Sequence, residues 1–198
     1  LAVDLGSTTI AAHLCDLRTG EVLASGGIMN PQIRFGEDLM SRVSYAMMNP
    51  GGDVEMTAAV RDAIDALARS VAGEAGVDPS AIFEAVVVCN PVMHHLFLGI
   101  DPVELGQAPF ALATGSSLSL AAREVALSAL NPEARLYTLP CIAGHVGADA
   151  AAVALSEAPQ EQDDLVLIVD VGTNAEILLG NKTRVLACSS PTDRKSVV

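Results

Sequence analysis

The chain has 198 residues, of which 51% are hydrophobic and only 3% aromatic, and its 24 acidic and 11 basic residues give a formal net charge of −13. This length holds one domain or slightly more, with a core built mainly from Ala, Val, Leu and Ile. The acidic excess argues against a nucleic-acid partner, because nucleic-acid-binding proteins present a basic face. No apolar run is long enough to span a bilayer and no signal peptide is recognisable, so no membrane partner is expected.

The four cysteines, Cys15, Cys89, Cys141 and Cys188, are scattered and include no Cys-x-x-Cys pair. This spacing argues against a locally held zinc ion or iron–sulfur cluster. Each cysteine lies in an apolar run, so we expect buried free thiols in a reducing compartment, the cytoplasm. The chain begins inside a strand and ends without a closing element, so we expect it to be a segment of a longer protein.

Three strands that form a meander are expected first, at residues 1–5, 10–16 and 21–28. The second strand shows the two-residue alternation of apolar side chains, and His13 is expected to be half-buried in it. A polar loop then leads into a helix over residues 38–48. Four charged residues of this region could form a cluster at the surface or line a cleft. The sequence by itself favours the surface cluster. The four residues are Arg34, Glu37, Asp38 and Arg42.

The middle of the chain is predicted from periodicity and capping residues. The expected order is a helix with Asp53 as its N-cap, a strand buried on both faces, a short helix begun by Asn90 and Pro91, a longer helix and a last strand. The last four elements are expected at residues 83–89, 92–98, 118–130 and 136–142. His94 and His95 point about 100° apart on a helix, so we expect structural roles for them rather than metal binding.

An alanine-rich helix is expected to follow Gly144 and Gly147. Its N-terminus favours a nearby phosphate. Asp149 in its first turn also fits an ordinary stabilising acid at a helix start, and the sequence supports both interpretations equally. A polar linker is expected next at residues 159–164, followed by a buried strand at 165–169. Two further strands, at 175–179 and 184–189, continue a second meander, so the second half starts to repeat the first.

A short stretch near the start of the chain returns near its end. The aligned pairs are Asp4 with Asp170, Gly6 with Gly172, and Ser7 with Thr173. In each copy an acidic residue at a strand end precedes a glycine turn, whose N–H groups and hydroxyls suit an anion. A carboxylate beside a phosphate requires a cation, and magnesium fits this role. Asp-x-Gly also occurs in ordinary hairpin turns, but two copies in matching strand context favour a shared nucleotide site.

These turns and the glycine-rich start of the helix between them resemble the acetate and sugar kinase, heat-shock chaperone and actin superfamily, whose members hold ATP between two ribonuclease-H-like domains. A narrower resemblance, to reductive activators of corrinoid proteins, spans nearly the whole chain. The blocks that carry it are Ala2–Thr9, Asn30–Gln32, Phe35–Asp38 with Arg42, Met93–Pro102, Leu105–Phe110, Gly144–Asp149 and Asp170–Glu176.

The resemblance implies an α/β fold, with a ribonuclease-H-like mixed sheet flanked by helices and then the truncated start of a second similar domain. The corresponding divisions are a first domain with its connecting helix at 1–158, a linker at 159–164 and the second domain from 165 to 198. Asp4 and Asp170 are implied to hold magnesium, and Asp149 to orient the attacking water or join the magnesium shell. The residues implied to contact the nucleotide are Gly6, Ser7, Thr8, Thr9, Gly144, Gly147, Gly172, Thr173 and Asn174.

In function, the resemblance implies ATP-dependent reduction of the cobalt of a corrinoid protein from Co(II) to Co(I), with ATP and magnesium as ligands. The full-length parent is expected to hydrolyse ATP and to carry a 2Fe–2S cluster in a separate N-terminal domain, and this segment is expected to be inactive alone. The expected partner is a corrinoid protein, and the sequence leaves open whether the protein forms a homodimer. The alternatives are a small-molecule kinase or a dehydratase activator of the same superfamily, or a non-catalytic dimerisation or docking module.

Overall fold

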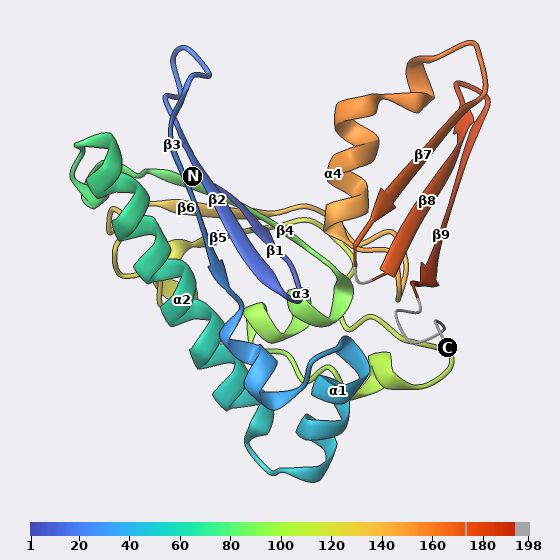
Figure 1. Ribbon diagram of the computed structural model, residues 1–198, viewed down its shortest axis with the longest axis horizontal. Helices are drawn as coiled ribbons and strands as arrows, with labels where there is room; N and C mark the ends of the chain where they lie inside the picture. The colour runs from blue at the N-terminus through green and yellow to red at the C-terminus, as the bar shows by residue number, and fades with distance from the viewer. Residues whose placement is uncertain (173, 193–198) are drawn as a thin grey trace, which may run out of the picture.

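The computed structural model describes residues 1–172 and 174–192 and shows a six-stranded sheet followed by a three-stranded sheet (Figure 1). The first sheet has the order β3-β2-β1-β4-β6-β5. β1 runs parallel to β4 and β4 to β6, whereas the other neighbours are antiparallel. Its strands are β1 (Ala2–Leu5), β2 (Thr9–Cys15), β3 (Val22–Met29), β4 (Glu84–Cys89), β5 (Leu118–Ala121) and β6 (Arg135–Thr138). This mixed sheet confirms the predicted fold class.

The helices and the second sheet complete the described part of the chain. The α-helices are α1 (Leu39–Met48), α2 (Gly52–Ala75), α3 (Pro91–Leu98) and α4 (Ala148–Glu157). Short 3-10 helices lie at Pro31–Phe35, Pro79–Ala81, Val103–Gly106, Ala122–Val125 and Pro159–Glu161. The second sheet is antiparallel and consists of β7 (Val166–Val171), β8 (Asn174–Asn181) and β9 (Arg184–Pro191). Within the described ranges, no helix combines the length and apolar character needed to cross a membrane.

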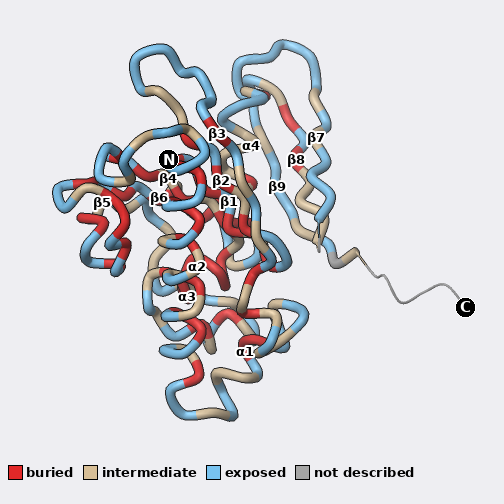
Figure 2. The backbone as a smooth tube through the Cα atoms, turned by 60° about the vertical axis from the view of Figure 1, so that its left-hand side comes forward, coloured by how far each residue is buried: buried red, intermediate tan, exposed pale blue. Residues whose placement is uncertain are grey.

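The core lies between the first sheet and α2, which packs across β2 and β3. In β2 the predicted alternation is confirmed, because Ile10, Ala12 and Leu14 are buried while the residues between them face outward. His13 is exposed rather than half-buried, and its Nδ1 lies 2.7 Å from the hydroxyl of Ser25 on β3. Figure 2 shows the buried segments concentrated in the first sheet, α2 and α3.

Side-chain caps begin two of the α-helices, and the cap at Asn90 is the one that was predicted. Asp38 caps α1 by accepting a hydrogen bond from Ser41 N–H, and Asn90 caps α3 in the same way through Met93 N–H. The prediction for α2 was wrong, because its N-cap is Gly51 in the left-handed region (φ 85°) and Asp53 lies in its first turn. The helix therefore begins at Gly52, one residue before Asp53.

The helix expected over residues 118–130 is absent; the structure has β5 and a single 3-10 turn there. β5 pairs with β6, with Leu118 opposite Thr138. The carboxylate of Glu124 accepts a hydrogen bond from Ala121 N–H, and Ala126 has a φ of 58° that ends the turn. Helix propensity was therefore overridden by pairing to a sheet edge, a contact that the local sequence does not contain.

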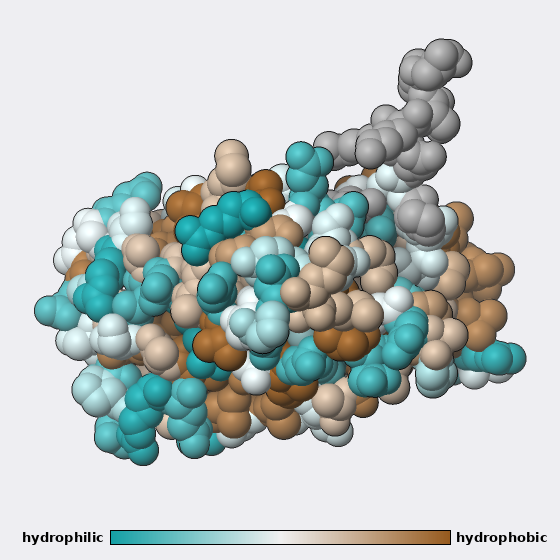
Figure 3. All heavy atoms as spheres, turned by 90° about the horizontal axis from the view of Figure 1, so that it is seen from below, coloured by the Kyte–Doolittle hydropathy of each residue, from teal (hydrophilic) through white to brown (hydrophobic). Residues whose placement is uncertain are grey.

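The strands expected to be buried are less covered than predicted. β4 is fully buried on one face and half-buried on the other. In β7, Leu167 and Val171 are 62% and 70% exposed. Figure 3 shows hydrophobic atoms at the end of the molecule formed by this sheet. All four cysteines are free; Cys89 and Cys141 are buried as predicted, but Cys15 is half-buried and Cys188 is exposed.

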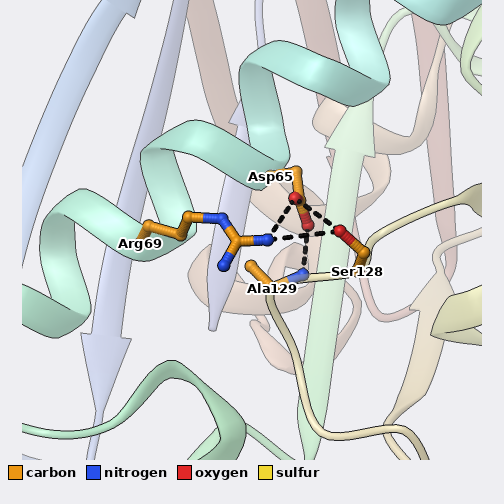
Figure 4. A network of polar contacts seen from close by, with 4 residues as sticks. All are labelled: Asp65, Arg69, Ser128 and Ala129. Carbon is orange, nitrogen blue, oxygen red and sulfur yellow. Dashed lines mark hydrogen bonds and ion pairs between the residues drawn. The ribbon is translucent and has the colours of Figure 1, made fainter.

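Asp65 on α2 ties this helix to the loop after β5 (Figure 4). Its carboxylate accepts hydrogen bonds from Ala129 N–H at 2.6 Å, the Ser128 hydroxyl at 3.1 Å and Arg69 at 3.0 Å. We expect Asp65→Ala to lower the free energy of unfolding by about 1–3 kcal/mol, because it leaves the buried Ala129 N–H without a partner. Urea unfolding measures this change.

The exposed Asp62, one turn earlier on α2, supplies the matched control for Asp65. Asp62→Ala is expected to change the free energy of unfolding by less than about 0.5 kcal/mol. Equal effects of the two substitutions would show that the hydrogen bonds of Asp65 do not stabilise the fold.

Candidate functional site

A cleft of about 280 Å³ is lined by residues from the end of β1, the start of α4 and the turn between β7 and β8. The two aspartate–glycine turns therefore meet in one cavity. The residues that line it are Asp4, Gly6, Ser7, Leu39, Asn90, Asp149, Asp170, Val171, Gly172, Asn174 and Glu176. Seven of these were predicted as site residues from the sequence.

The remaining predicted residues lie elsewhere or outside the described part of the chain. Thr9 begins β2 and pairs with Met29, and Thr8 is exposed beyond the cleft lining. Gly144 packs against the backbone of Phe110, where an added Cβ would lie 2.2 Å from the carbonyl oxygen. Thr173 lies outside the described residues. Contact of these residues with a nucleotide therefore stays a prediction.

The first turn is held from behind by the loop and helix that follow β3. Asn30 donates from its side chain to Gly6 O and from its backbone N–H to Thr8 O, both at 2.8 Å. Arg42 on α1 donates to the carbonyl between them, Ser7 O. Gly6 is required for this shape, because an added Cβ would lie 2.6 Å from Thr9 O.

The four charged residues predicted to form a surface cluster do not all lie at the surface. Arg34, Glu37 and Asp38 remain at or near the surface, but Arg42 is completely buried. Its guanidinium also donates to Gly36 O at 3.0 Å, Gln32 Oε1 at 3.4 Å and Met93 Sδ at 3.1 Å. Burial lowers the pKa of Arg42 to about 10, partly offset by Asp38, so the side chain stays charged at neutral pH.

The second turn presents two carboxylates on one face of the second sheet. Asp170 on β7 and Glu176 on β8 are directly opposed across the strands, and both line the cleft. The Ser189 hydroxyl on β9 donates to Glu176 at 3.1 Å. The Gly172 N–H donates within the turn to Asn174 O at 2.8 Å, so this amide is engaged inside the protein.

The start of α4 supplies the third side of the cleft. Gly147 is its N-cap, and an added Cβ there would lie 2.4 Å from Cys89 O at the end of β4. Glycine therefore lets the helix begin directly against the end of the first sheet. This position carries Asp149 into the cleft, where its Oδ1 accepts a hydrogen bond from Ala150 N–H at 2.8 Å.

Four carboxylates face this small volume, and three of them have raised pKa values. Burial raises the pKa of Asp149 to about 6, and the charges of Glu176, Asp4 and Asp170 add to the effect against the Ala150 hydrogen bond. Burial, followed by the charge of Asp170, raises the pKa of Asp4. Burial also raises the pKa of Glu176, opposed by the Ser189 hydrogen bond. This mutual repulsion makes the cleft a favourable place for a cation.

The oxygen-rich lining fits a magnesium ion that keeps most of its water. Among the residues that the structure describes, no three His, Cys, Asp or Glu side chains are arranged to hold a metal ion by themselves. A hard cation bound through one or two carboxylates, water and phosphate oxygens requires no such group. Asp4 and Asp170, at the two turns, are among the carboxylates that line the cleft.

Sequence reasoning did not select Glu176 or Asn90 as site residues. Glu176 is two residues beyond the second turn, and the cross-strand register that places it beside Asp170 depends on the β7–β8 pairing. Asn90 was assigned only as a helix cap, which it is, but the β4–α3 junction also brings it to the cleft. A signal for Glu176 was present, because it closes the last sequence block that carries the family resemblance.

The family model described as RACo middle region matches residues 1–161, and the model described as the C-terminal domain of RACo, the ASKHA domain, matches residues 164–193. The chain belongs to the RACo family. It is 34% identical over 181 residues to the corrinoid activation enzyme RamQ of Eubacterium limosum, covering 91% of this chain and 30% of that protein.

A solved structure named reductive activator for corrinoid, iron–sulfur protein superposes on this RACo-family chain with a TM-score of 0.92 and 36% sequence identity. The superposition covers 96% of this chain and 31% of that one. The chain thus spans about a third of the length of the relatives that it matches. Their names describe corrinoid activation.

Proposed function

We propose that this chain is the ATP-binding region of a protein that reductively activates a corrinoid protein, returning its cobalt from Co(II) to Co(I). The observation that carries the proposal is the single cleft into which both aspartate–glycine turns and the start of α4 project. Membership of the RACo family and the names of its relatives support the corrinoid protein as partner.

The proposed roles follow from position in the cleft. Asp4 and Asp170 hold magnesium, mainly through water, and Asp149 orients the attacking water or joins the magnesium shell. Bound magnesium would supply the positive charge that offsets both the carboxylates and the phosphates. The backbone and side chains of the two turns contact the phosphates. The lining residues assigned this contact are Gly6, Ser7, Gly172 and Asn174.

We also propose a division into a first domain at residues 1–158, a linker at 159–164 and a second domain from residue 165. The cleft then lies at the junction of the two domains, so ATP that touches both turns binds a closed arrangement more tightly than an open one. Such differential binding is what allows ATP to drive a change of state. A 2Fe–2S cluster in another domain of the intact protein would supply the electron.

Energy input is needed because the reduction to Co(I) is expected to be uphill from the electron donor. Each step of about 59 mV costs about 1.4 kcal/mol for one electron, a tenfold change in equilibrium. A gap of several such steps leaves a negligible amount of Co(I) without coupling to ATP. ATP-dependent appearance of Co(I) is therefore the decisive measurement.

The test follows the Co(I) absorption spectrum of a corrinoid protein mixed with the intact activator, an electron donor and MgATP. Gly172→Ala is the sharpest variant, because an added Cβ lies 3.6 Å from its nearest neighbour, an ordinary contact that the fold accommodates. Because Gly172 lines the cleft, we expect the added methyl group to take up space proposed for phosphate. We expect unchanged thermal stability and at least about tenfold weaker ATP-dependent reduction, the cost of an overpacked ligand site.

The competing functions make different predictions in the same assay. A small-molecule kinase would consume ATP only with an added acceptor, and would show no dependence on the corrinoid protein. A dehydratase activator would reduce its own partner and not cobalt. A docking module would show no ATP dependence at all. Any of these outcomes would contradict the proposed function, as would full activity in Gly172→Ala.

A further inference from the structure

Arg42 is a buried cation without a carboxylate partner. It is the largest fully buried side chain of the described residues, and no ion pair with it is formed within them. Its hydrogen-bond acceptors are two backbone carbonyls, an amide oxygen and a thioether. Asp38 acts on it only at longer range, since its own carboxylate caps α1. An unpaired buried charge is costly, so its retention calls for a functional reason.

The carbonyls that Arg42 and Asn30 hold are three in succession, those of Gly6, Ser7 and Thr8. In a planar trans peptide the N–H group points opposite to the carbonyl. Fixing each carbonyl toward the buried side therefore fixes the N–H of the next residue toward the other side. Gly6 and Ser7 line the cleft.

We propose that Arg42 is a positioning residue for the nucleotide phosphates, acting through the backbone of the first turn. The guanidinium holds the carbonyl of Ser7, a residue that lines the cleft, and so fixes and polarises the backbone against which a phosphate would bind. This inference rests on the proposed function and adds a residue that does not touch the nucleotide itself.

The charge balance of the cleft supports this role. Four carboxylates line it, and no Lys or Arg is among its described lining residues. Phosphates entering the cleft bring further negative charge, which one magnesium ion only partly offsets. A permanent cation directly behind the turn adds attraction without blocking the space that the phosphates need. Hydrogen bonds that involve a charged group are stronger than neutral ones, and in a buried site the effect is larger.

The test uses three variants of the intact protein and measures the dissociation constant of MgATP together with the melting temperature. Arg42→Met removes the charge and all donors while keeping an unbranched buried side chain. Arg42→Lys keeps the charge. Arg61→Met is the control, because Arg61 is half-buried and, like Arg42, donates to a backbone carbonyl, here Phe97 O at 2.8 Å, away from the cleft lining.

We expect Arg42→Met to bind MgATP at least about tenfold more weakly, the size of a lost charge-assisted hydrogen bond. Arg42→Lys is expected to stay within about threefold of the wild type, and Arg61→Met to bind normally even if it is less stable. If Arg42 only stabilises the fold, Arg42→Met would lower the melting temperature, and Arg42→Lys would not restore MgATP binding. If Arg42→Met does not fold, Arg42→Gln takes its place under the same thresholds.

Wild-type affinity in Arg42→Met would overturn the inference, and so would equal losses in Arg42→Lys and Arg42→Met or an equal loss in Arg61→Met. These results would leave the proposed function in place, because they all require wild-type protein that binds MgATP. Failure of the wild type to bind MgATP would instead contradict the proposed function. The two failures are therefore distinguished by the wild-type measurement.

Discussion

Asn substitution of Asp4 or Asp170 is expected to weaken magnesium-dependent ATP binding by the intact protein at least about 100-fold, because losing one partner of a desolvated charge interaction costs about 3 kcal/mol or more. Both carboxylates line one cleft, and the charge of Asp170 contributes to the raised pKa of Asp4. Asparagine keeps the size and the turn but removes the negative charge that would hold a hydrated magnesium ion. Isothermal titration with MgATP measures the loss.

The same variants make an opposite prediction when magnesium is chelated. A bare polyphosphate is repelled by Asp4 and Asp170, so removal of either charge should leave ATP binding in EDTA unchanged or make it tighter. The sign reversal between magnesium and EDTA is hard to produce by misfolding. Asp62→Asn, at an exposed position on α2, is expected to have no effect in either condition. Unchanged MgATP affinity in both cleft variants would show that these aspartates do not hold the metal ion.

Asp149→Asn is expected to stabilise the protein at neutral pH in the absence of divalent cations while lowering ATP turnover at least about 100-fold, a typical loss for a general base or water-orienting group. Burial raises the pKa of Asp149 to about 6 in the folded state. Between its unfolded pKa and about 6, the folded protein binds more protons than the unfolded chain, so stability falls as pH rises. A displacement from 3.8 to about 6 corresponds to about 3 kcal/mol.

Urea unfolding in EDTA at a series of pH values between 4 and 8 measures this effect. The wild type is expected to lose stability between about pH 4 and pH 6 and then to level off, whereas Asp149→Asn should lose less over the same window. Above that window the variant should be the more stable protein. Magnesium should reduce the difference, because a bound cation favours the charged carboxylate.

Asp53 provides the control that separates the two interpretations of Asp149. It lies in the first turn of α2 just as Asp149 lies in the first turn of α4, but it does not line the cleft. An acid that only stabilises a helix start loses about 0.3–1 kcal/mol when neutralised. We expect that loss for Asp53→Asn and the opposite sign for Asp149→Asn. Losses of equal sign and size would assign Asp149 to helix stabilisation and remove it from the proposed mechanism.

Local patterns in the sequence predicted the elements whose information is contained within a few residues. The alternation in β2, the cap Asn90 and the second meander were predicted correctly, because periodicity and capping are properties of a continuous stretch. The matching turns around Asp4 and Asp170 were also recognised from the sequence, since each has the same strand, carboxylate and glycine. Nothing in either stretch alone states that the two turns face each other.

The tertiary structure decided the features that depend on which segments become neighbours. Residues 118–121 form a strand because β6 offers an edge, although the stretch predicted a helix. Glu176 enters the cleft through its register with Asp170, and Arg42 is buried behind the first turn instead of lying at the surface. The sequence around a charged side chain looks the same whether that side chain lies on a surface helix or is buried beneath the first turn. Only the contacts formed by distant parts of the chain determine whether its charge faces water or supports the site.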